Sequence, residues 1–163
     1  MQNSELQIFN LLRQDITATG MLVLGSWAVL NILVFALVWV RKTGSTTGYF
    51  AQMNVLWNLV NLALAVSGWL DATATPEVAL SLAETVREQF SIEKILLFNA
   101  GLDAGYIMTG FFLQEKAKTD SKRPLLLKGY GMALALQGIF LAIFDLLLCW
   151  LHSQHAAELY GLL

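Results

Sequence analysis

Residues 16–40 of the chain read ITATGMLVLGSWAVLNILVFALVWV and contain no charged side chain. A helix needs about 20 mainly apolar residues to cross the hydrocarbon core of a bilayer, so this run predicts a transmembrane span. Arg41 and Lys42 end it, and residues 43–70 form a second uncharged run that is also long enough to span.

Two later runs are almost as apolar, but each carries one carboxylate. Residues 95–114 contain Asp103, and residues 129–151 contain Asp145. An acid in a membrane helix is costly and rare, which weakens the prediction without removing it. We therefore predict four spans in a single transmembrane domain of residues 1–163, at about 18–40, 49–70, 94–114 and 128–151.

The composition agrees, since 56% of the 163 residues are hydrophobic and only 13% are charged. About a quarter of the residues are charged in soluble domains. The predicted fold class is an all-α membrane protein, a bundle of four transmembrane helices. The net charge of -2 argues against a nucleic-acid partner.

Loop charges predict the orientation. The first and third connections carry seven basic residues, whereas the second connection carries the acidic ones, Asp71, Glu77, Glu84, Glu88 and Glu93. Basic loops stay in the cytoplasm, so both termini are expected on the outer, periplasmic side of a cell inner membrane.

Two polar segments have apolar residues at helical spacing and are predicted to be short amphipathic helices on the outer surface. They are residues 4–16, with Leu6, Phe9 and Leu12, and residues 76–90, with Val78, Leu82 and Val86. The second is expected to lie over the outer mouth of the bundle.

The spans carry polar residues in stripes, which cannot face lipid. One stripe of the second span holds Asn54, Trp57, Asn58 and Asn61; the third span repeats the pattern with Asn99, Asp103, Tyr106 and Gly110. The fourth span offers Tyr130, Gln137, Asp145 and His152 in one broad sector, and the first span offers Asn31. The candidate ligand-binding residues are Asn54, Trp57, Asn58, Asn61, Asn99, Asp103, Tyr106, Gln137 and Asp145.

Asp103 is the strongest candidate for a functional residue, because placing an aspartate at the centre of a membrane helix costs about 3 kcal/mol even on lenient insertion scales. Carboxamides both donate and accept hydrogen bonds, so an asparagine cluster suits a carboxyl group that binds a proton or a small ligand. The competing explanation is that the polar residues only join helices, at roughly 1 kcal/mol for each hydrogen bond. That explanation is favoured for Asn31 or Gln137 taken alone.

Two smaller motifs have structural explanations. Gly101 and Gly105 form a GxxxG pattern on another face of the third span and are expected to allow close helix packing. His152, His155 and Glu158 have the spacing of a partial metal site, but polar residues are expected where a helix leaves the membrane, so no metal site is assigned.

The segments QMNVLWNLVN (52–61), KILLFNAGLDAGYIMTGFFL (94–113) and KGYGMALALQGIFLAIFD (128–145) resemble an uncharacterised group of small bacterial four-helix integral membrane proteins of unknown function. The resemblance covers most of residues 49–145. It implies a location and a helix count, and it supplies no catalytic residue.

Three classes of function stay open. The first is a buried polar site that binds a small ligand or proton for transport or sensing. The second is a non-catalytic subunit or scaffold of a membrane complex, and the third is a membrane enzyme that acts on a lipid or quinone. No positioned nucleophile accompanies the carboxylates, so no catalytic residue is assigned and an enzyme is the least supported class. The sequence specifies no cofactor; the expected partners are the lipid bilayer and, through a homo-oligomer or larger complex, other chains.

Overall fold

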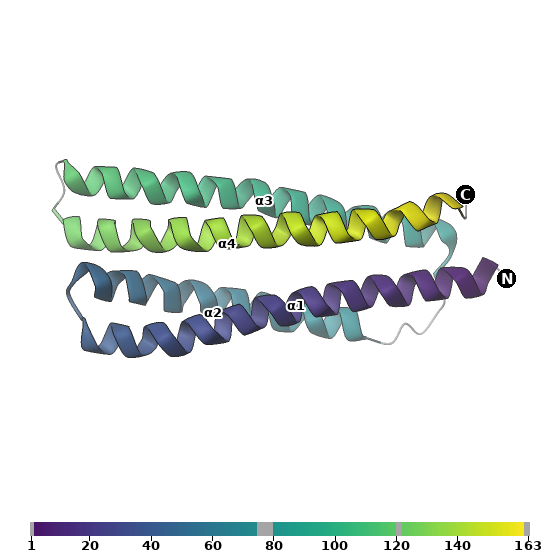
Figure 1. Cartoon of the computed structure of the whole chain (residues 1–163), viewed down its shortest axis with the longest axis horizontal. Coiled ribbons are helices and arrows are strands. Elements are labelled where there is room, and N and C mark those ends of the chain that lie inside the picture. The colour runs from purple at the N-terminus through teal and green to yellow at the C-terminus, as the bar shows by residue number, and fades with distance from the viewer. Residues whose placement is uncertain (1, 75–79, 120–121, 162–163) are drawn as a thin grey trace.

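The chain folds into four long helices, as the sequence predicts (Figure 1). A computed structural model describes residues 2–74, 80–119 and 122–161. The helices are α1 (Gln2–Arg41), α2 (Thr46–Thr73), α3 (Leu82–Lys118) and α4 (Pro124–Ala156), and a 3-10 turn, η1 (Ala157–Gly161), follows α4. All four helices are long and apolar enough to cross a membrane.

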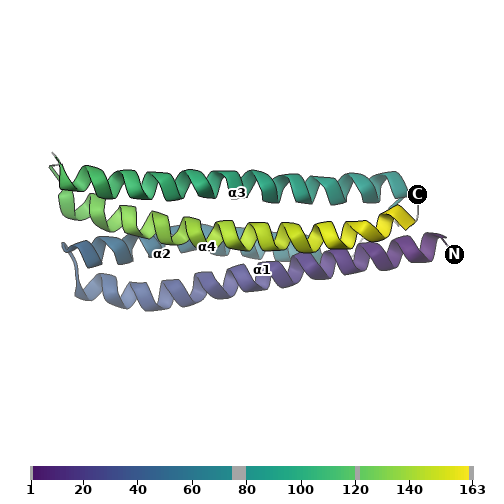
Figure 2. The same cartoon turned by 45° about the horizontal axis from the view of Figure 1, so that its top comes forward.

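The helices form two antiparallel hairpins, α1 with α2 and α3 with α4, packed side by side (Figures 1 and 2). Most of the contact between the hairpins is made by α2 and α4, and α2 hardly touches α3 within the described residues. Both termini lie at one end of the bundle, and the α1–α2 and α3–α4 turns lie at the other (Figure 1).

Local signals set where the helices begin. Ser45 caps α2 by accepting a hydrogen bond from the Gly48 backbone N–H, and Gly44 before it takes the left-handed φ of 75° that the turn requires. Ser81 and Glu84 form a reciprocal capping box at the start of α3. Pro124 occupies the first turn of α4, where its missing N–H is not needed.

The two expected surface helices are not separate elements. Residues 4–16 are the first turns of α1, and residues 82–90 are the first turns of α3; residues 76–79 of the second prediction, including Val78, lie outside the described residues. No glycine or proline interrupts residues 2–19 and none interrupts residues 82–100, so each surface segment continues into its span.

The long helices extend past the end of α2 near the termini (Figure 1). At 1.5 Å per residue, α1 and α3 are about 60 Å and about 55 Å long, against a hydrocarbon core of about 30 Å. The projecting parts, residues 6–13, 82–89 and 152–159, pack together, and we call them the head. Its apolar cluster is Leu6, Phe9 and Leu159 with Leu82 and Val86 against it, so α3 lines the head and does not lie across the mouth as expected.

The packing of α3 on α4 depends on glycines other than the predicted pair. A Cβ at Gly110 would lie 2.6 Å from the backbone oxygen of Gly131, and one at Gly138 would lie 2.9 Å from that of Asp103. By contrast, no heavy atom of the described residues lies within 4 Å of a Cβ built at Gly101 or Gly105. The expectation that this GxxxG pair packs helices is therefore wrong within the chain, because the pair faces outward.

Candidate functional site

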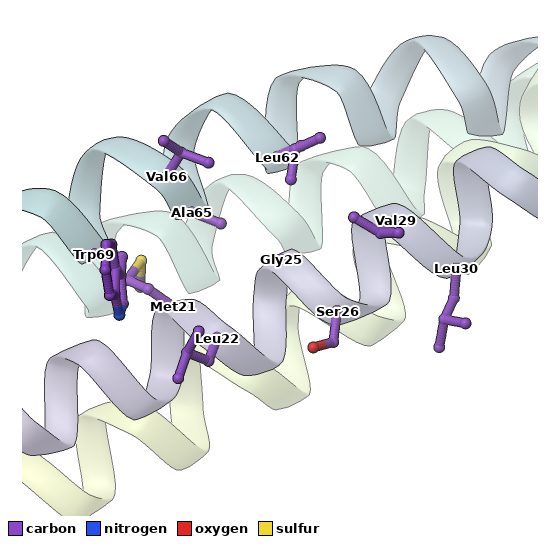
Figure 3. A pocket seen from close by; sticks show the side chains of 10 residues that line it. All are labelled: Met21, Leu22, Gly25, Ser26, Val29, Leu30, Leu62, Ala65, Val66 and Trp69. Atoms are coloured by element: carbon purple, nitrogen blue, oxygen red, sulfur yellow. The ribbon is translucent and has the colours of Figure 1, made fainter.

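One hollow on the bundle, of about 640 Å³, presents no charged or titratable side chain. It lies between α1 and α2, and its walls are aliphatic apart from Trp69, Met21 and the hydroxyl of Ser26 (Figure 3). None of its lining residues is titratable. A groove of this kind suits an acyl chain rather than a polar ligand.

Some of the predicted polar residues form hydrogen bonds with one another inside the bundle. The Nε2 of Gln137 donates to Oδ1 of Asn54 at 2.6 Å and to Oδ1 of Asn31 at 3.5 Å, and its Oε1 accepts from the indole N–H of Trp27 at 3.1 Å. Asn58 donates to the backbone oxygen of Asn54 at 2.8 Å. We call these five residues the polar ladder; it joins α1, α2 and α4 by direct hydrogen bonds.

The remaining predicted residues line a different space, a cavity of about 270 Å³. We call it the central cavity. Its polar and aromatic walls come from α2, α3 and α4, namely Trp57, Asn61, Asn99, Asp103, Tyr106, Phe144 and Asp145. The rings of Trp57 and Tyr106 meet edge to face, with centroids 4.7 Å apart, and so bridge the otherwise open side between α2 and α3.

Two buried polar atoms in these walls have no hydrogen-bond partner among the described residues: Oδ2 of Asp103 and the indole Nε1 of Trp57. The Asp103 residue is only 3% exposed. Buried polar groups are nearly always hydrogen-bonded in folded proteins, so an unpartnered pair in one cavity points to an occupant.

Asp103 and Asp145 face one another from antiparallel helices. Helical side chains tilt toward the N-terminus of their helix, so in an antiparallel pair the two side chains lean together. The carboxyl groups come within hydrogen-bonding range. Since a carboxylate has no donor, such a hydrogen bond forms when one of the two carries a proton.

A third space of about 520 Å³ continues from the central cavity toward the termini, and we call it the terminal cavity. The two cavities share five lining residues, Leu24, Leu64, Asn99, Phe144 and Asp145. Polar groups of the head and of α2, including Arg13, Glu88, Asp71 and His152, line its far part. The route from Asp145 therefore leads to the end that holds the termini.

The head contains a polar network that the sequence analysis missed. Arg13, 4% exposed, forms an ion pair with Glu88 and donates to the backbone oxygen of Thr85 at 3.2 Å. Asn10 donates to the Thr85 hydroxyl at 3.0 Å, and Gln89 donates to the backbone oxygen of His152 at 2.8 Å. The sequence did contain a pattern that could have revealed this network, because polar residues continue the apolar stripes at helical spacing. Asn10 and Arg13 follow Leu6 in this way, and Thr85 and Gln89 follow Leu82.

Both histidines belong to this network rather than to a shared ligand set. Nε2 of His152 lies 3.3 Å from the Thr17 hydroxyl. The Thr17 hydroxyl already donates to the Arg13 backbone, so the hydrogen-bond pattern assigns the His152 proton to Nε2. His155 stacks on Phe9, with centroids 4.0 Å apart, and contacts the Phe9 backbone oxygen through Nε2 at 2.9 Å. Nδ1 of His152 is unpartnered among the described residues.

The structure thus divides the predicted site. Trp57, Asn61, Asn99, Asp103, Tyr106 and Asp145 share the central cavity, whereas Asn54, Asn58 and Gln137 lie in the polar ladder. Asn61 connects the two groups through a long contact, 3.5 Å, from its Nδ2 to Oδ1 of Asn58.

Comparison with known proteins identifies relatives without a known activity. The model of a family of unknown function, DUF6992, matches residues 23–146. No curated protein and no solved structure matches the chain. The matched segment includes all six of the central-cavity residues named above, while Arg13 and His152 lie outside it.

Proposed function

We propose that this chain, which belongs to the DUF6992 family of unknown function, is a multi-pass membrane protein that binds a proton or a small ligand in its central cavity, for transport or sensing. The observation that carries the proposal is the carboxyl group of Asp103. It is buried, one of its oxygens lacks a donor among the described residues, and it faces a cavity and a second carboxyl group.

The distribution of polarity supports the membrane setting. Large apolar side chains cover the outside, among them Val40 and Met108, each 72% exposed. The interior is polar, with Asn54 and Asn58 fully buried. Exposing so much apolar surface to water is energetically unfavourable. In a bilayer the same surface contacts lipid, and the polar groups must face the interior of the bundle.

The proposed setting is the inner membrane of a bacterial cell, with both termini outside. The charge pattern supports this orientation, because the basic turns lie together at one end of the bundle and the termini lie at the other (Figure 1).

A cysteine-labelling experiment tests the orientation. In a Cys149→Ala background, a cysteine at Ser45 should be shielded from a membrane-impermeant thiol reagent in intact cells and should react after permeabilisation. A cysteine at Ala74, at the opposite end, should react in both states. Labelling at Ser45 but not at Ala74 in intact cells would reverse the proposed topology.

The site itself is tested by following carboxyl protonation with infrared spectroscopy in reconstituted protein. Two interacting carboxyl groups release their protons in two separate steps that belong to the pair, so the parent should show two steps that Asp103→Asn reduces to one. The other titratable groups that line the joined cavities are Tyr106, Asp71, Glu88, Arg13 and His152.

Glu115→Gln is the matched control, because Glu115 is an exposed carboxylate on the same helix, paired with Lys118. It should leave both cavity steps in place. If the titration of Asp103→Asn equals that of the parent while the variant is equally stable, the carboxyl group serves only to join helices, and the binding site proposed here does not exist.

A second candidate, a scaffold or subunit of a membrane complex, is favoured by one observation. Gly101 and Gly105 lie on the exposed surface of α3 next to exposed apolar side chains such as Phe98 and Met108. Outward-facing small residues at this spacing allow another membrane helix to approach closely. Such a role is compatible with a ligand site on the opposite side of α3.

A further inference from the structure

The charge of the joined cavities is not balanced by the chain. The central cavity is lined by two acids and by no Lys, Arg or His among the described residues. In the terminal cavity the one lysine or arginine among the described lining is Arg13, and it is occupied by Glu88 and the Thr85 backbone. Asp71 adds another carboxylate at the rim.

Two of the three unpartnered atoms in the joined cavities are acceptors. They are Oδ2 of Asp103 in the central cavity and Nδ1 of His152 in the terminal cavity, if His152 carries its proton on Nε2 as its contact with Thr17 assigns; the third, the Trp57 indole N–H, is a donor. His152 is fully buried, so this second acceptor cannot be satisfied by bulk water. An occupant that complements the carboxyl groups donates hydrogen bonds to them and carries positive charge.

Aromatic rings line the central cavity together with Asp103 and Asp145. Trp57 and Tyr106 meet at the α2–α3 side of the central cavity, and Phe144 lies on its α4 wall. The electron-rich faces of such rings attract cations, and the attraction strengthens where water is excluded. Acids and rings together resemble the walls that proteins use for organic cations more than those they use for metal ions.

The rim of the central cavity is apolar and exposed. Val60 and Leu64 on α2 are 60% and 57% exposed, and Leu102 on α3 is 42% exposed, although all three line the cavity. Away from the Trp57–Tyr106 contact, α2 hardly touches α3 in the described part of the chain, so the cavity opens sideways beside that contact onto the surface that lipid would cover. An occupant that enters there must have an apolar body.

We propose that the central cavity binds an organic ammonium ion with an aromatic or aliphatic body, whose charged nitrogen lies beside the carboxyl groups of Asp103 and Asp145 and whose apolar part lies against Trp57, Tyr106 and Phe144. This inference rests on the proposed function and gives its ligand a chemical class. A dehydrated inorganic cation would be a poorer match, because the cavity of about 270 Å³ is far larger than one ion and half-lined by hydrocarbon.

The direct test is isothermal titration calorimetry of the whole chain in detergent micelles. The probe is N,N-dimethyl-2-phenylethylammonium, and 2-phenylethanol is its uncharged analogue. The parent should bind the ammonium at least tenfold more tightly than the alcohol. Asp103→Asn and Asp145→Asn should each weaken ammonium binding at least tenfold, while Glu115→Gln should leave it unchanged.

A second measurement needs no variant. A hydrophobic carbodiimide modifies carboxyl groups in apolar surroundings, and mass spectrometry reports the fraction modified at Asp103 and Asp145. The tertiary ammonium cannot couple to the activated acid, so it should only protect, lowering modification at least tenfold where the alcohol does not. This result remains informative if Asp103→Asn fails to fold.

The outcomes separate the two proposals. If the two-step carboxyl titration is present but the ammonium binds no better than the alcohol and gives no protection, the ammonium inference is overturned and the proton site remains. If both the titration and the binding are absent, the proposed function fails with it. Charge-dependent binding that survives both aspartate substitutions would place the ligand elsewhere and also overturn the inference.

Discussion

Gly110→Ala is expected to destabilise the protein by about 2–3 kcal/mol, the upper part of the roughly 1–3 kcal/mol that forcing extra atoms into a tightly packed interior costs. The new Cβ would lie 2.6 Å from the Gly131 backbone oxygen and 2.7 Å from the Ala135 backbone nitrogen. Backbone atoms cannot move aside as a flexible side chain can, so α3 and α4 must separate along their shared length. Unfolding by dodecyl sulfate in mixed micelles measures the change.

Gly101→Ala provides the matched control on the same helix. Its Cβ would meet no described atom within 4 Å, so the substitution should be neutral or slightly stabilising, because alanine favours helix over glycine. Equal destabilisation by the two substitutions would contradict the close packing of α3 on α4 described above. A loss of stability at Gly101 alone, dependent on protein concentration, would instead identify an interface between copies.

Gln137→Leu is expected to cost about 3 kcal/mol, since it deprives three partners of hydrogen bonds at about 1 kcal/mol each. Those partners are the indole N–H of Trp27 and the side-chain oxygens of Asn54 and Asn31. The two-step carboxyl titration of the surviving folded protein should be unaltered, because Gln137 does not line the central cavity.

Asn61→Leu should behave in the opposite way. Its single described side-chain hydrogen bond is 3.5 Å long, so the loss of stability should stay below about 1 kcal/mol. Its side chain nevertheless lines the cavity beside Asp103, so the titration of the carboxyl pair should change. Unfolding in micelles and infrared titration measure both Gln137→Leu and Asn61→Leu. If the two variants behave alike, the polar ladder and the central cavity act as one unit.

Sequence periodicity was sufficient for the main helices because an uncharged run of bilayer length has few alternatives. It failed at the head. Residues 4–16 and 82–90 contain enough polar residues to suggest a boundary, yet the polar residues Arg13, Thr85 and Gln89 are buried. Their burial depends on partners from other helices, such as Glu88 for Arg13, and one helix's pattern cannot reveal a partner that distant in sequence.

The candidate site was predicted in the same incomplete way. The stripes on α2 and α3 correctly placed polar residues inside, but Asn58 and Asn61 lie on one stripe and have different surroundings. What distinguishes them is that Asn58 donates to the Asn54 backbone oxygen, whereas Asn61 lines the central cavity. Glycines control helix approach, and the sequence did not show that Gly110 faces a helix whereas Gly101 does not.

The head has a consequence for how the protein is made. Glu88 follows Arg13 by 75 positions, which is about 4–15 s of translation at about 5–20 residues per second. For that interval the nascent first hairpin holds a guanidinium without its partner. The His155 contact to the Phe9 backbone spans 146 positions and cannot form until the whole of α4 has been synthesised. Closure of the head therefore requires that all four helices have been made, and a chain that stops before α4 leaves the polar groups of α1 and α3 in the head without their α4 partners.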